Sequence, residues 1–114
     1  MAKGKEPSDY LPLSESTFYI LAALREPMHG YGVMQKTEEV SAGAVTIGPG
    51  TLYGAFTTLQ KEGLIEMVRE EDRRKVYQLT TMGLEVLKEQ VERYGLMLRY
   101  GSEAAGKDNT GGEE

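Results

Sequence analysis

The residues best suited to chemistry in this chain lie on one face of a predicted helix that opens at Gly48-Pro49. Its apolar residues recur at helical spacing and predict a buried face of Leu52, Ala55, Phe56 and Leu59. Small and hydroxylated residues dominate elsewhere on the helix: Gly50, Thr51, Tyr53, Gly54, Thr57, Thr58 and Lys61. Hydroxyls can bond to phosphate oxygens, threonine methyls can contact thymine methyls, and glycines let the backbone approach closely. The pattern favours a helix that enters the major groove of DNA; the alternative is an ordinary solvated helix face.

A short charged segment supplies the positive charge that this helix lacks. Arg73, Arg74 and Lys75 lie between two runs rich in Ile, Val and Tyr, which predict a β-hairpin over residues 64–79. Cations at the tip of such a hairpin can contact phosphates or enter the minor groove. In the alternative arrangement, Arg73 and Arg74 pair with the neighbouring acids Glu70, Glu71 and Asp72.

Catalytic residues are scarce. The chain has no cysteine and one histidine, His29, which precedes a predicted helix and fits a capping or packing role better than that of a metal ligand. Gly48-Pro49-Gly50 lacks the Lys-Ser/Thr pair that a phosphate-binding loop needs. An enzyme acting on a small molecule is therefore the weakest hypothesis, and we expect no catalytic residue, no metal and no cofactor.

The net charge of −5 does not exclude DNA as a partner, because the charge is unevenly distributed. Four acids and one lysine fall in residues 102–114, whereas four basic residues stand against three acids in residues 69–75. The chain has no apolar run long enough to span a bilayer and no visible signal peptide, so we expect no membrane partner and a cytoplasmic location.

The elements that position these residues form a single domain. Ser14 or Ser16 can cap a first helix, residues 30–40 form a second, and Thr80 can cap the last. The expected fold class is mainly α with a small β-hairpin: a winged helix–turn–helix followed by a C-terminal dimerisation helix. The expected divisions are a flexible arm (1–13), the winged helix–turn–helix (14–80), the dimerisation helix (81–100) and a disordered acidic tail (101–114).

The last helix carries an apolar seam with heptad spacing: Leu84, Leu87, Val91, Tyr94 and Leu98. Such a seam predicts a homodimer, in which this otherwise isolated helix finds a partner. Tyr94 is most simply an interface residue. Its ring can also stack on a flat ligand held between the subunits, and the two roles are compatible.

Several segments together resemble the PadR family of regulators over residues 16–98: Pro27-Met28-His29-Gly30-Tyr31-Gly32, Gly50-Thr51-Leu52-Tyr53, Leu59-Gln60-Lys61-Glu62-Gly63-Leu64-Ile65 and the stretch from Arg73 to Gly83. The single C-terminal helix is similar to that of the family's smaller subclass. The chain departs from the family in having Gly54 where proline is common and Thr57 and Thr58 near a frequent arginine. These departures concern which operator sequence is bound.

The resemblance implies a homodimeric transcriptional regulator, usually a repressor that leaves a palindromic operator when an effector binds. It also implies that an aromatic or drug-like molecule can bind between the subunits, against an aromatic residue at a position such as Tyr94. The main rival hypothesis is a winged-helix module for protein–protein contact, which the acidic balance favours.

Overall fold

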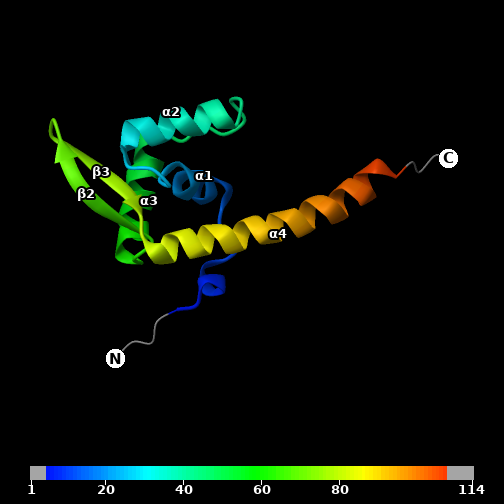
Figure 1. The fold of residues 1–114 in the computed structure, drawn as a ribbon. Helices are drawn as coiled ribbons and strands as arrows, with labels where there is room; N and C mark the ends of the chain where they lie inside the picture. The colour runs from blue at the N-terminus through cyan, green and yellow to red at the C-terminus, as the bar shows by residue number, and fades with distance from the viewer. Residues whose placement is uncertain (1–4, 108–114) are drawn as a thin grey trace.

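Three short helices pack around one apolar core, and a fourth, longer helix runs past them and projects from the body (Figure 1). The computed structural model describes residues 5–107. Its elements are the 3-10 helix η1 (Pro7–Tyr10), α1 (Glu15–Ala23), β1 (Met28–His29), α2 (Gly30–Val40), α3 (Pro49–Lys61), β2 (Ile65–Glu71), β3 (Arg74–Leu79) and α4 (Thr81–Gly106). This order confirms the predicted winged helix–turn–helix with a C-terminal helix.

The helix boundaries follow from residue types that are visible in the sequence. The Ser14 hydroxyl accepts the amide hydrogen of Thr17 and caps α1, and the Thr80 hydroxyl accepts that of Gly83 and caps α4. Pro49 occupies the first turn of α3, where its missing N–H leaves no bond unmade. Gly63 follows α3 at a φ of 80°, the left-handed conformation that ends many helices.

The wing is the hairpin of β2 and β3, and it belongs to a three-stranded antiparallel sheet of order β1-β3-β2. β1 pairs Met28 with Tyr77 and His29 with Val76, so the wing is tied to the residues just before α2. The pairing of β2 with β3 shifts between Met67 and Arg69, which leaves Val68 as an extra residue. This bulge accounts for the imperfect alternation of the hairpin sequence.

One cluster of buried apolar side chains forms the core, and it takes residues from all four α-helices and from β2 and β3. Those with almost no exposure include Ile20, Leu21, Leu24, Val33, Leu52, Leu64, Ile65, Val76 and Val86. Burying side chains of this size contributes about 1.5–3 kcal/mol each. The first turn of α4 packs directly on the connection between α3 and β2: a Cβ at Gly83 would overlap the carbonyl oxygen of Leu64, so only glycine fits.

The N-terminal arm differs from the expected flexible segment. Residues 7–10 form η1, and Tyr10, Leu11 and Leu13 pack against the core. The Leu13 amide donates to Oε1 of Gln90 at 2.6 Å, and Gln90 is 1% exposed. The expectation was wrong for this part because the apolar arm residues have a docking surface on α4 that local composition does not reveal. Residues 1–4 lie outside the described range.

The last helix is also longer than expected. It continues to Gly106, so residues 101–106 are helical and do not belong to a disordered tail. Extending an existing helix costs far less than starting one, and Glu103, Ala104 and Ala105 have adequate helix propensity. The rest of the expected tail, residues 108–114, lies outside the described range. Across residues 5–107, no helix is long and apolar enough to cross a membrane.

Candidate nucleic-acid interface

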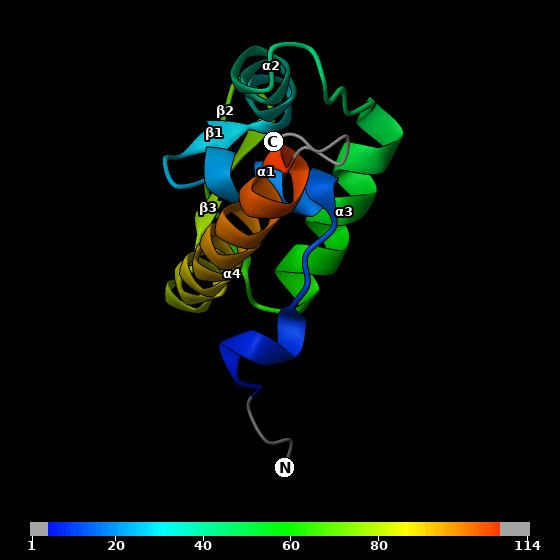
Figure 2. The ribbon, with the colours of Figure 1, turned by 90° about the vertical axis from the view of Figure 1, so that its right-hand side faces the viewer.

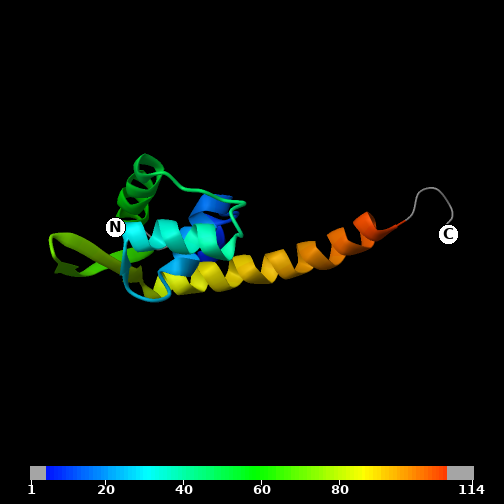
Figure 3. The same cartoon turned by 90° about the horizontal axis from the view of Figure 1, so that it is seen from above.

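The outer face of α3 is open, as the sequence pattern predicts. Leu52, Phe56 and Leu59 are buried, and Ala55 is half-buried. The seven residues chosen from the remaining faces are all exposed: Gly50, Thr51, Tyr53, Gly54, Thr57, Thr58 and Lys61. Figures 2 and 3 show α3 on one side of the body, with α1 between it and α4. The helix is therefore held by its apolar face and free to enter a groove with the other.

Tyr53 has a defined position on this face. Its ring packs edge-on against Phe56, with centroids 5.9 Å apart, and lies over Gly30 at the start of α2. A Cβ at Gly30 would approach the Tyr53 hydroxyl oxygen to 2.5 Å, so glycine is what lets the ring lie there. The side chain is still 51% exposed. A large, oriented aromatic with a free hydroxyl thus stands at the edge of α3.

Thr57 is oriented by its own helix. Its hydroxyl donates to the Tyr53 carbonyl oxygen at 3.0 Å, which is a common arrangement for threonine within helices. The hydroxyl oxygen keeps lone pairs that can accept hydrogen bonds from base amino groups, and the methyl group can contact a thymine methyl.

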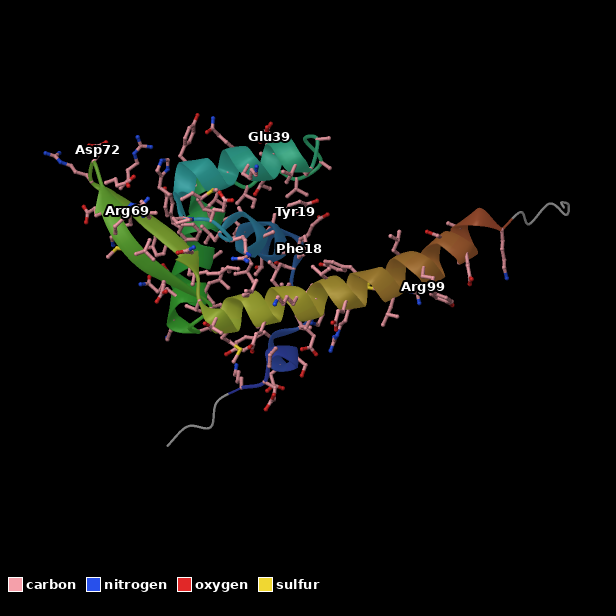
Figure 4. All side chains as sticks on the ribbon, viewed as in Figure 1. Phe18, Tyr19, Glu39, Arg69, Asp72 and Arg99 are labelled. Carbon is pink, nitrogen blue, oxygen red and sulfur yellow. The ribbon has the colours of Figure 1, made fainter. Side chains whose placement is uncertain are left out.

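The wing tip carries exposed cations on a tight turn. Asp72 and Arg73 both have positive φ, at 49° and 67°, which is the backbone of a two-residue hairpin turn that matches strand twist. Within residues 5–107 the one ion pair joins Arg69 to Glu71, so Arg73 and Arg74 do not form the expected alternative pairs with the acids. Figure 4 shows Asp72 at the tip and Arg69 lower on the hairpin.

Two hollows flank the exposed face of α3. On one side, Tyr53 and the wing cations Arg73, Arg74 and Lys75 line a hollow of about 240 Å³. On the other, Gly54 and Thr58 line a hollow of about 480 Å³ that the N-terminal arm closes with Lys5 and Tyr10. Of the predicted helix residues, the structure thus brings Tyr53 next to the predicted wing cations, whereas Gly54 and Thr58 face the hollow on the side of the arm.

The predicted seam on α4 divides into two parts. Leu84 and Leu87 are half-buried, and Leu87 packs against the core of its own chain, whereas Val91 is 50% and Leu98 70% exposed. The face of α4 turned into the core is formed by Gly83, Val86 and Gln90. The expectation that α4 has little to pack against is therefore wrong for its first half. It fits the second half, where residues 95–106 are all exposed.

Tyr94 lies at the junction between these halves, in an aromatic cluster. Its ring packs edge-on against Phe18 of α1 at 5.0 Å, and Phe18 packs edge-on against Tyr19 at 5.7 Å. With Glu15 these residues line an open hollow of about 400 Å³. Figure 4 shows Phe18 and Tyr19 on the side of α1 that faces the projecting part of α4.

His29 caps α2, as its sequence context suggests, because its Nδ1 accepts the amide hydrogen of Gly32. The sequence does not predict the second contact of this ring. The ring lies beside the wing, with Nε2 3.3 Å from a guanidinium nitrogen of Arg74. The two-residue strand that brings it there is too short to show alternation. Among residues 5–107, no group of three or more His, Asp or Glu side chains is arranged to hold a metal ion.

Comparison with known proteins identifies the family. The model of the "Transcriptional regulator PadR-like family" matches residues 20–89, more than half of the chain. "Transcriptional regulator YqjI" of Escherichia coli K12 is 33% identical over 69 residues, which are 60% of this chain and 33% of that protein. A 37.1 kDa protein of transposon TN4556 from Streptomyces fradiae is 35% identical over 75 residues, 65% of this chain and 21% of that protein. The chain thus spans a third or less of these relatives.

Solved structures share the fold at low identity. The PadR-like regulator of Bacillus cereus has a TM-score of 0.68 and 24% identity, covering 82% of this chain and 92% of its own. The PadR family regulator of Eggerthella lenta has a TM-score of 0.65 and 24% identity, covering 90% and 87%. RosR of H. salinarum has a TM-score of 0.64 and 22% identity, covering 86% and 99%. The family match confirms the resemblance seen in the sequence motifs, and the family is one of regulators rather than enzymes. This chain belongs to the PadR-like family of transcriptional regulators.

Proposed function

We propose that the protein is a homodimeric repressor that binds a palindromic DNA operator in the cytoplasm and leaves it when a small-molecule effector binds. The observation that carries the DNA-binding geometry is the open face of α3 beside the basic wing tip. In this proposal α3 lies in the major groove, and Arg73, Arg74 and Lys75 contact backbone phosphates. The wing supplies the positive charge that attracts the DNA, and the small residues of α3 allow this helix to approach the base edges closely.

The experiment is a binding titration with the DNA upstream of the protein's own gene and with a scrambled duplex, each repeated across salt concentrations. A specific regulator binds the upstream DNA more tightly, and both affinities fall steeply with salt because phosphate contacts release counterions. A protein–protein module would bind neither duplex in this manner.

Tyr53→Phe and Thr57→Ala are the matched variants for this titration. Each is expected to weaken binding to the upstream DNA by about 1–3 kcal/mol, about 5- to 150-fold, while binding to the scrambled duplex changes little. Neither should unfold the protein, because the Tyr53 ring packing is kept and alanine has the higher helix propensity. A lower unfolding midpoint in either variant would show that the side chain supports the core instead of reading DNA.

The dimer is supported by the unpartnered half of α4. Val91, Tyr94 and Leu98 share one face at spacings of three and four residues, and beyond Tyr94 none of the described residues covers the helix, because positions 95–106 are all exposed. A second copy of the same helix is the partner that an apolar heptad seam fits. It would place two α3 helices on one DNA, as a palindromic operator requires.

The effector site is proposed at the aromatic cluster of Phe18, Tyr19 and Tyr94, next to that seam. Aromatic walls suit a flat aromatic or drug-like molecule, which can stack on one ring and contact the edges of the others. An effector releases DNA only if it binds the DNA-incompetent dimer better than the competent one. Binding beside the seam meets this condition if it changes the spacing of the two α3 helices.

Tyr94→Ala tests this site with a panel of planar aromatic dyes, measured by fluorescence. The loss of one stacking ring is worth about 0.5–1.5 kcal/mol beyond buried area, so dye affinity is expected to fall about two- to tenfold. Tyr94→Phe keeps the ring and is the control, with affinity close to that of the unchanged protein. Equal dye binding in Tyr94→Ala and Tyr94→Phe would exclude Tyr94 from the site.

A further inference from the structure

The hollow between the wing and α3 gathers hydrogen-bond donors from separate elements. Arg74 and Lys75 reach it from the wing, Tyr53 from α3, and His29 from β1. No acidic side chain is among the described residues that line it. Its volume of about 240 Å³ is enough for a phosphate group. An electrically one-sided hollow of this kind attracts an anion.

The contacts of the two nitrogens of His29 indicate which kind of group this hollow can bind. Nδ1 accepts the amide hydrogen of Gly32 at 3.4 Å, as the cap of α2. A neutral ring that accepts at Nδ1 carries its proton on Nε2, which is therefore a donor. Nε2 lies 3.3 Å from the Arg74 guanidinium, whose nitrogens only donate. In this tautomer Nε2 and the guanidinium are both donors, so an anion placed between them can accept from each.

We propose that this hollow binds one phosphodiester group of the DNA backbone, with His29 as a contact residue. Nε2 of His29 and the guanidinium of Arg74 donate to the phosphate oxygens, and the Lys75 ammonium adds charge. The proposal rests on the proposed function and deepens it. It adds a phosphate contact shared between the wing and His29 of β1, beside the edge of α3, so that one bound group fixes the wing and the nearby helix together.

His29 contacts two elements that hold the proposed phosphate site in place. Its backbone pairs with Val76 of β3, and its ring caps α2, which packs against α3. The same residue therefore connects the wing with the helical part of the domain. A phosphate bound at Nε2 is therefore held at a fixed offset from Tyr53. That offset sets how α3 is aligned along the groove, because backbone contacts determine register.

His29→Asn separates the phosphate contact from the cap. Asparagine is among the best helix-capping residues, so the bond to Gly32 is kept, while the shorter side chain withdraws its donor from the hollow. We expect about tenfold weaker binding to a mixed-sequence duplex of about 30 base pairs, with an unchanged unfolding midpoint. Lys75→Gln should weaken binding similarly. Lys36→Gln, which removes the same charge from the exposed face of α2, should have little effect.

A second measurement uses the intact protein, because His29 is its one histidine and gives one set of imidazole nitrogen signals. In NMR spectra of the free protein we expect the proton on Nε2. Adding the duplex should shift the Nε2 signal and leave Nδ1 nearly unchanged. A proton on Nδ1 instead would mean that Arg74 donates to Nε2, and the proposal would fail.

The remaining outcomes separate the sources of phosphate and the two proposals. If inorganic phosphate shifts the Nε2 signal and the bound duplex does not, the hollow takes a free phosphate and the proposed DNA contact is wrong. If the duplex binds His29→Asn as tightly as the unchanged protein, this contact is excluded while the proposed function stands. If the unchanged protein binds no duplex at all, the proposed function itself fails.

Discussion

Val91→Asp is expected to make the protein monomeric and to weaken operator binding about a hundredfold or more. Val91 is half exposed in the single chain, so an aspartate there is solvated in the monomer and does not disturb the fold. In a dimer the same position is desolvated, and an unpaired buried charge costs about 3–5 kcal/mol. Loss of the second subunit removes the gain of binding two half-sites at once.

Sedimentation measures the first step and the duplex titration the second. Arg93→Asp is the matched control, because it introduces the same side chain two residues away, on an exposed part of the helix outside the seam. It should stay dimeric and keep its operator affinity. A monomeric unchanged protein, or a fully dimeric Val91→Asp, would remove the seam as the interface, together with the effector site proposed beside it.

Boundaries that depend on local chemistry could be predicted from the sequence. Ser14 and Thr80 cap their helices, Pro49 opens α3, and Gly63 ends it, because each residue type satisfies a need of the backbone where it stands. The buried face of α3 follows from its apolar spacing. The exposed face, and with it most of the candidate site, then follows as the remainder.

Features that depend on distant partners could not be predicted in this way. Strand β1 has two residues and exists because β3 is beside it: Met28 pairs with Tyr77 and His29 with Val76, far along the chain. Gln90 is buried because the amide of Leu13 reaches it, and nothing about a glutamine signals burial. The same limit applies in part to His29: its cap of α2 could be predicted from the sequence, but its place next to Arg74 depends on the pairing of β1 with the wing.

The double variant Arg73→Ala/Arg74→Ala is expected to weaken binding to operator and scrambled DNA alike. Both side chains are exposed at the wing tip, and neither forms an ion pair among residues 5–107. Affinity falls with salt, and each phosphate-binding side chain that is removed should reduce the magnitude of the slope of log affinity against log salt by about 0.9. The salt dependence of the double variant should therefore be shallower by up to about two units. Because phosphates carry no sequence information, the ratio of specific to non-specific affinity should change little.

Lys36→Ala/Arg99→Ala controls for the change in net charge. Lys36 lies on α2, and Arg99 lies on the projecting part of α4 (Figure 4), so this variant removes two positive charges away from the wing. Its salt slope should stay close to that of the unchanged protein, since exposed charges beyond about 10 Å from the DNA are largely screened at moderate salt. Equal slopes in the wing variant and the control would mean that the wing arginines contact no phosphate. A shallower slope in the wing variant alone, with both variants folded and dimeric, places the phosphate contacts at the wing tip, where the charge complements the nearly uncharged face of α3.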